Sequence, residues 1–133
     1  MKTIITFGTF DLFHIGHLNI LTRARQLGDR LIVGVSSDAL NIRKKGRTPV
    51  YDQQDRMQIL EALKCVDAVF LEESLEKKAD YIQQFDANVL VMGDDWTGRF
   101  DAVSRDCEVI YLPRTPSIST TSVIEVVKTK GER

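Results

Sequence analysis

The sequence predicts one α/β domain over residues 1–133, with a Rossmann-like, doubly wound, five-stranded parallel sheet. Three observations lead to this fold class. Short runs of apolar and β-branched residues alternate along the chain with segments whose apolar residues recur at helical spacing. Strands that alternate with helices pair in parallel through right-handed crossovers, which gives an open sheet covered on both faces. A length of 133 residues allows one ordinary hydrophobic core and no second one.

The first strand is expected at residues 2–7 and the first helix at 18–27, where Gly28 follows as a C-terminal cap. Asp52 is placed to cap a second long helix that ends near Lys64. Near the end of the chain, Ser122 and Glu125 have the spacing of a capping box. The remaining expected elements are strands at 30–36, 68–71, 88–92 and 108–112, a helical turn at 38–41, and a charged helix at 75–84.

Composition excludes several classes of function. A chain with 43% apolar residues, 28% charged residues and a net charge of −1 gives no reason to expect nucleic-acid binding. The first residues show a strand pattern with no basic segment leading into an apolar run, and no apolar stretch approaches membrane-spanning length. We therefore expect a cytoplasmic protein that is neither exported nor inserted into a membrane. Cys65 and Cys107 are far apart and lack metal-ligand spacing, which favours reduced thiols over a disulfide.

Both histidines of the chain, His14 and His17, fall where the first strand passes into the first helix. The first turn of a helix presents unpaired N–H groups and the positive end of the dipole, which together favour a phosphate. Gly16 between the histidines allows a ligand to approach the backbone closely. A surface histidine beside a core histidine is the plainer interpretation, and a zinc site lacks a third ligand.

Residues 43–50 are basic, contain Gly and Pro, and are expected to form an exposed mobile loop. Lys44, Lys45 and Arg47 in this loop are either simply solvated or form a lid over a triphosphate, and the sequence leaves both open. Lys77 and Lys78 belong to a Glu-Lys-Lys helix face that would ordinarily be exposed to solvent.

Two later loops also carry candidate site residues. Asp94 and Asp95 either cap a turn or accept hydrogen bonds from a base or ribose, while Trp96 serves packing or lines a substrate site. Residues 114–120 combine Arg114 with four hydroxyl side chains ahead of the last helix, which favours an anion site over a plain cap. Ligands of such sheets bind beyond the carboxyl ends of the strands, where these loops are expected to meet.

Two motifs together resemble a known family. Residues 14–17, His-Ile-Gly-His, resemble the HxGH motif of the nucleotidylyltransferase superfamily, and residues 114–121 resemble the RTxGIST signature of its cytidylyltransferase branch. With residues 8–11 and 92–96, almost the whole chain is similar to the bacterial glycerol-3-phosphate cytidylyltransferases. The resemblance implies five parallel strands, a homodimer, and the Mg²⁺-supported reaction of CTP with sn-glycerol 3-phosphate to give CDP-glycerol and pyrophosphate.

The resemblance also assigns roles by position. It implies that His14 and His17 contact the CTP phosphates, that Lys44 and Arg114 join them in catalysis, and that Lys44, Lys78 and Trp96 bind the acceptor. Mg²⁺ would be held mainly by the nucleotide phosphates, with no protein metal site. The remaining residues implied in nucleotide binding are Thr9, Phe10, Asp11, Asp38, Lys45, Asp94, Asp95, Thr115, Ile118, Ser119 and Thr120.

The chain departs from the family pattern at Ser117, which stands where glycine is usual, and at Leu75, which replaces an aromatic residue. The basic segment also differs in length, so either Lys45 or Arg47 can serve as its second cation. Three alternatives stay open: an adenylyltransferase, a cytidylyltransferase for a heptose phosphate or phosphoethanolamine, and a nucleotide-binding sensor without turnover.

Overall fold

A computed structural model of the chain describes residues 1–105, 107–115 and 119–131. Its centre is a five-stranded parallel sheet in the order β3-β2-β1-β4-β5. The strands are β1 (Thr3–Gly8), β2 (Arg30–Ser36), β3 (Ala68–Glu72), β4 (Val89–Gly93) and β5 (Glu108–Leu112). The chain therefore winds outward from β1 in both directions, which confirms the predicted doubly wound fold.

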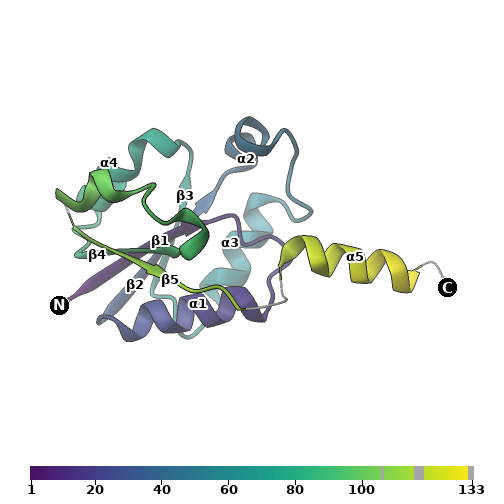
Figure 1. The fold of residues 1–133 in the computed structure, drawn as a ribbon, viewed down its shortest axis with the longest axis horizontal. Coiled ribbons are helices and arrows are strands. Elements are labelled where there is room, and N and C mark those ends of the chain that lie inside the picture. Colours follow the sequence, from purple (N-terminus) through teal and green to yellow (C-terminus); the bar gives the residue numbers. More distant parts are fainter. Residues whose placement is uncertain (106, 116–118, 132–133) are drawn as a thin grey trace.

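Helices cover both faces of this sheet (Figure 1). On one face, α1 (Ile15–Gln26) and α3 (Gln53–Glu61) pack against a core cluster that includes Leu21, Ala24 and Leu60. On the other face, α4 (Lys78–Gln84) contributes Ile82 to a second cluster. α2 (Asp38–Lys45) follows β2, and α5 (Thr120–Gly131) extends away from the body (Figure 1). Three short 3₁₀ turns complete the described elements: η1 (Leu75–Lys77), η2 (Asp94–Trp96) and η3 (Asp101–Arg105).

Both faces of the central strands are buried, so apolar residues occur on both faces of each strand rather than alternating with polar ones. Ile4 belongs to the first cluster and its neighbour Ile5 to the second, and both are fully buried. In the middle of β2, Gly34 leaves room for two aromatic rings. A Cβ atom at this position would lie 2.6 Å from Phe7 Cδ1 and 2.7 Å from Phe70 Cζ.

The sheet separates the two cysteines. Cys65 packs against the first cluster, whereas Cys107 belongs to the second cluster on the opposite face. A disulfide between them, the less favoured of the two expectations, is therefore wrong. Among the helices of the described residues, none is long and apolar enough to span a membrane.

The basic segment differs from its prediction, because residues 43–45 are helical rather than part of a loop. The Ser37 side chain accepts a hydrogen bond from Leu40 N and caps α2, and Gly46 ends the helix with a left-handed φ of +73°. α2 thus continues four residues beyond the expected helical turn at 38–41. The consequence is that Lys44 and Lys45 are held on a helix instead of a mobile loop.

Two other helix starts also differ from the sequence prediction. The expected helix at 75–84 divides into η1 and α4. At the last helix, the cap lies three residues earlier than expected. Ser119 Oγ accepts a hydrogen bond from Ser122 N at 3.1 Å, and Ser119 N donates to Ser122 Oγ at 2.9 Å. Ser122 therefore occupies the third helical position, and its predicted pairing with Glu125 is not the cap.

Candidate active site

An open cavity of about 480 Å³ lies at the carboxyl ends of β1, β2 and β4, where the topology places ligands. Gly8, Ser36 and Met92 at these strand ends form part of its wall. The cavity also receives residues from α1, α2, α4, η2 and α5. The loops after β1 and β4, the basic segment after β2 and the start of α5 therefore meet at one place.

Ten of the predicted site residues line this cavity: Thr9, Phe10, Asp11, His17, Lys44, Lys45, Lys78, Asp95, Trp96 and Thr120. Arg47 also lines it, so both candidates for the second cation of the basic segment are present. Six predicted residues are not part of the lining: His14, Asp38, Asp94, Arg114, Thr115 and Ser119. Ile118 and Ser117 lie outside the described residues.

The two histidines form a stacked pair at the start of α1. Their ring centroids are 3.8 Å apart, with an interplanar angle of 19°. His14 is the N-cap residue, and its Nδ1 accepts a hydrogen bond from Gly16 N at 3.1 Å. His17 Nδ1 accepts from His14 N at 3.3 Å, so the two imidazoles act as a reciprocal capping box.

These hydrogen bonds determine where the histidines carry their protons. Burial lowers the pKa of His17 to about 4, helped by the neighbouring His14, and burial also lowers the pKa of His14. Both rings are therefore neutral near pH 7. Because each Nδ1 accepts a backbone N–H, each Nε2 must carry the proton. His14 Nε2 is buried without a hydrogen-bond partner among the described residues, which leaves a donor for an incoming oxygen.

Asp11 anchors the segment that closes one side of the cavity. Its carboxylate accepts hydrogen bonds from Val50 N at 2.7 Å and from Tyr51 N at 2.9 Å. Its backbone carbonyl accepts a hydrogen bond from Thr120 Oγ1 at 3.0 Å. Asp11 thereby joins the β1–α1 loop to the segment before α3 and to the start of α5, which is a positioning role.

Arg56, which the sequence analysis did not select, is buried beneath this loop with 1% exposure. Its guanidinium donates to the carbonyls of Tyr51, Thr9 and Ser36 and pairs with Asp38 Oδ1 at 2.7 Å. Asp38 therefore acts through Arg56 and not on the cavity surface. Arg56 lies four residues before Leu60 and therefore on the buried face of α3, which was the signal in the sequence that could have identified it.

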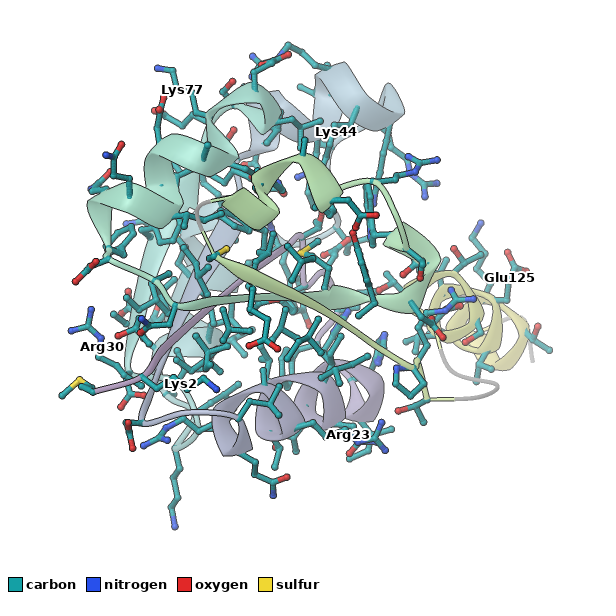
Figure 2. The ribbon with its side chains drawn as sticks, turned by 60° about the vertical axis from the view of Figure 1, so that its left-hand side comes forward. Lys2, Arg23, Arg30, Lys44, Lys77 and Glu125 are labelled. Atoms are coloured by element: carbon teal, nitrogen blue, oxygen red, sulfur yellow. The ribbon has the colours of Figure 1, made fainter. Side chains whose placement is uncertain are left out.

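Lysine side chains gather on the wall formed by α2 and α4, where Figure 2 shows Lys44. Lys44 Nζ donates to Ser36 Oγ at 3.0 Å. Burial lowers the pKa of Lys44 to about 8, although the nearby Glu72 opposes this shift. The expectation that both residues of the Lys77–Lys78 pair are exposed is wrong for Lys78, which is 5% exposed, while Lys77 is at the surface (Figure 2).

Glu72 is the second residue that the sequence analysis did not select. This buried carboxylate forms an ion pair with Lys78 Nζ and accepts a hydrogen bond from Ser36 Oγ at 3.3 Å. Ser36 and Glu72 are partners in the register of β2 and β3, at the last position of each strand. A charged residue that ends an otherwise apolar strand was the signal that could have identified it.

Of the remaining predicted residues, Asp95 and Trp96 line the cavity, whereas Asp94, Arg114 and Thr115 are not part of its lining. Asp94 and Asp95 are exposed, and the Trp96 ring contacts that of Phe100 at a tilt of 35°, with ring centroids 5.6 Å apart. Arg114 is exposed on the turn before α5. Thr115 Oγ1 accepts a hydrogen bond from Asn19 Nδ2 of α1 at 2.9 Å, which ties this turn to the histidine-bearing helix.

Comparisons with known proteins agree with this architecture. Residues 5–126 match the family described as cytidylyltransferase-like. Glycerol-3-phosphate cytidylyltransferase of Bacillus spizizenii is 49% identical over 123 residues, which cover 92% of this chain and 95% of that protein. The protein of the same name from Bacillus subtilis strain 168 is 46% identical over 127 residues, which cover 96% of this chain and 98% of the relative.

Among solved structures, the lipopolysaccharide core biosynthesis protein from Thermoplasma volcanium GSS1 has a similar fold. It aligns with a TM-score of 0.76 and 23% identity, over 86% of this chain and 98% of that one. At this identity, the likeness supports the fold alone. The match over residues 5–126 and the two Bacillus relatives show the family. The chain therefore belongs to the cytidylyltransferase-like family.

Proposed function

We propose that the protein transfers CMP from CTP to sn-glycerol 3-phosphate, giving CDP-glycerol and pyrophosphate. The observation that carries this proposal is the arrangement of the cavity: the neutral imidazole of His17, stacked on that of His14 at the N-terminus of α1, lines one part of the wall, and Lys44, Lys45 and Lys78 line other parts. Such a site can accommodate two phosphate groups at once. The names of the two Bacillus relatives support the choice of CTP and glycerol 3-phosphate.

The reaction needs no strong general base. The second pKa of a phosphomonoester is about 6, so the acceptor is largely dianionic near pH 7. One of its phosphate oxygens attacks the α-phosphorus of CTP and forms the new P–O bond. The bond from the α-phosphorus to the oxygen bridging to the β-phosphorus breaks, and pyrophosphate leaves with that oxygen and its electron pair. The enzyme's task is to position the reactants and to stabilise charge.

His14 and His17 are suited to stabilise the transferring group. Each neutral ring presents an Nε2–H donor, and the buried donor of His14 has no partner among the described residues. The N-terminus of α1 adds the positive end of the helix dipole at the same place. Preorganised donors of this kind lower the transition-state energy because they need no reorientation during the reaction.

The lysine wall is suited to bind the acceptor phosphate. Lys44 and Lys78 both line the cavity, and both are held by contacts to buried groups rather than projecting freely into solvent. An ammonium group that is fixed before substrate arrives loses less conformational entropy on binding. Arg114, on the turn tied to α1 through Thr115, is proposed to join the pyrophosphate end.

We further propose that Mg²⁺ accompanies CTP and is held mainly by the phosphate oxygens. Over the described ranges, no group of three or more His, Cys, Asp or Glu side chains is placed to hold a metal ion by itself. Asp95 supplies an exposed carboxylate on the cavity wall, which is the oxygen donor that Mg²⁺ prefers. When bound, the ion neutralises charge on the triphosphate.

We also propose that the protein works in the cytoplasm, where CTP is made, and that it forms a homodimer. Two apolar side chains of α5, Val126 and Val127, are 52% and 64% exposed on a helix that extends from the body. A second copy could cover them. Sedimentation equilibrium checks the oligomeric state, and a monomer at micromolar concentration would contradict the dimer.

The test of the proposed function is pyrophosphate release with CTP or ATP, each combined with glycerol 3-phosphate, a heptose phosphate or phosphoethanolamine. We expect turnover with CTP and glycerol 3-phosphate to exceed every other pair. Turnover with ATP alone would identify an adenylyltransferase, and preference for another acceptor would reassign the substrate. Saturable CTP binding without pyrophosphate release from any pair would identify a sensor.

A further inference from the structure

A single buried carboxylate connects two of the cations in the cavity wall. Glu72 Oε2 pairs with Lys78 Nζ at 2.5 Å. Glu72 Oε1 accepts a hydrogen bond from Ser36 Oγ, and Ser36 Oγ in turn accepts one from Lys44 Nζ at 3.0 Å. The hydroxyl of Ser36 can both donate and accept, so the contacts form one continuous chain from Lys44 through Ser36 and Glu72 to Lys78.

This chain lies in surroundings where an unpaired charge would be costly. The Glu72 side chain is 1% exposed and that of Lys78 is 6% exposed. Lys78 Nζ also lies 4.3 Å from the ring centroid of Phe7 and 5.2 Å from that of Phe100. Aromatic faces stabilise an ammonium group but provide no negative charge, so Glu72 is the carboxylate that compensates Lys78 here.

We propose that Glu72 is a positioning residue that holds both Lys78 and, through Ser36, Lys44 at one end of the cavity. Two ammonium groups and one carboxylate leave a net positive charge there, and both lysines line the cavity. A dianionic phosphate is the ligand class that complements this excess. The assignment of that ligand as the acceptor phosphate rests on the proposed function, whereas the coupling of Glu72 to the lysines does not.

The charge state of Lys44 reports on this coupling. The groups that face it are Glu72, which raises its pKa, and Lys45, Lys78 and Arg56, which lower it. Together with burial they leave the pKa at about 8. Removing the carboxylate therefore favours the neutral amine, and Lys44 would lose its proton within the physiological range.

The experiment is an NMR titration of the Lys44 side-chain amine in the ligand-free protein, comparing wild type with Glu72→Gln. We expect a midpoint near pH 8 in the wild type and about one unit lower or more in the variant, which is tenfold or more in the protonation equilibrium. Glu73→Gln is the matched control because Glu73 is exposed and does not line the cavity. The Lys44 midpoint in this variant should equal that of the wild type. An unchanged midpoint in Glu72→Gln would overturn the proposal.

A second variant keeps the test decisive if Glu72→Gln does not fold. The double variant Glu72→Gln, Lys78→Met removes the carboxylate together with the Lys78 ammonium group, which would otherwise stay buried without its ion-pair partner. Its Lys44 midpoint should still fall below that of the wild type, because Glu72 influences the pKa of Lys44 more than Lys78 does. A midpoint at or above the wild-type value would contradict the coupling.

The KM values for the two substrates provide a second test that does not depend on the titration. At pH 8, Glu72→Gln should raise the KM for glycerol 3-phosphate at least about fivefold, because the protonated fraction of Lys44 falls from about one half to about one eleventh, while the KM for CTP changes less than about threefold. Inorganic phosphate is the probe for binding without turnover, and its Kd should rise in parallel. Equal effects on both substrates would contradict a role confined to the acceptor end. A wild type without activity on glycerol 3-phosphate would refute the proposed function but leave the titration result standing.

Discussion

Replacing Arg56 with methionine should destabilise the fold by about 3–5 kcal/mol, because three backbone carbonyls lose a charged donor at about 1–3 kcal/mol each. The guanidinium makes hydrogen bonds to three backbone carbonyls and an ion pair with Asp38. Methionine has similar length but satisfies none of these groups. The buried Ser36 carbonyl keeps only the 3.4 Å hydrogen bond from Asn41 Nδ2, whereas Asp38 can recover water because its side chain is 32% exposed.

The assay is urea unfolding followed by circular dichroism, with the melting temperature as a second measure. For a domain of this size, the expected loss lowers the melting temperature by about 10–20 °C. Arg56→Lys keeps the positive charge but lacks the planar guanidinium with its several N–H donors, so it should give an intermediate loss of stability. Arg43→Met is the matched control: its exposed side chain makes one hydrogen bond, to the Glu73 carbonyl, and should cost less than about 1 kcal/mol. An Arg56→Met loss no larger than that of the control would refute the argument.

Three further predictions follow from the core and the histidine pair. Gly34→Ala should destabilise the protein by about 1–3 kcal/mol, because its Cβ would lie 2.6 Å from a Phe7 ring carbon, and an unchanged urea midpoint would count against this packing. His17→Ala should lower turnover at least about a hundredfold with the circular dichroism spectrum retained, and near-normal turnover would rule out the donor role. The pKa of His17 is about 4 in the folded protein, below its ordinary 6.5, so its contribution to stability is lost as the pH falls through this interval. Between pH 7 and pH 5 that loss is about 2 kcal/mol, and unfolding measurements should show it in the wild type but not in His17→Asn. Equal losses in the two proteins would contradict the shifted pKa.

The fold could be predicted from the sequence because the apolar patterns of the individual segments and the alternation of strands with helices indicate the same parallel sheet. The strand at 30–36 is apolar on both faces, which is typical of a buried parallel strand, and the structure places it between β3 and β1. The meeting of separate loops at one sheet edge followed from topology alone. The topology placed the loops after β1, β4 and β5 at the same edge, and His17, Asp95 and Thr120 from or next to these loops line one cavity.

The features that sequence reasoning missed depend on partners in other elements. Arg56 and Glu72 are buried charges: Arg56 pairs with Asp38 of α2, and Glu72 pairs with Lys78 of α4 and accepts a hydrogen bond from Ser36 of β2. Lys78 belongs to a Glu-Lys-Lys run that is typical of a solvated helix face, but Glu72 and the rings of Phe7 and Phe100 enclose its ammonium. The start of α5 was misplaced because two serines three residues apart compete for the cap, and reciprocal bonds between Ser119 and Ser122 decide the outcome.

The central claim is that an acceptor phosphate oxygen attacks the α-phosphorus of CTP. Its most direct test uses glycerol 3-phosphate with ¹⁸O in the phosphate group, followed by mass spectrometry of both products. In-line attack keeps every labelled oxygen in CDP-glycerol and leaves the pyrophosphate unlabelled. Labelled pyrophosphate, or pyrophosphate release without any CDP-glycerol, would contradict the account.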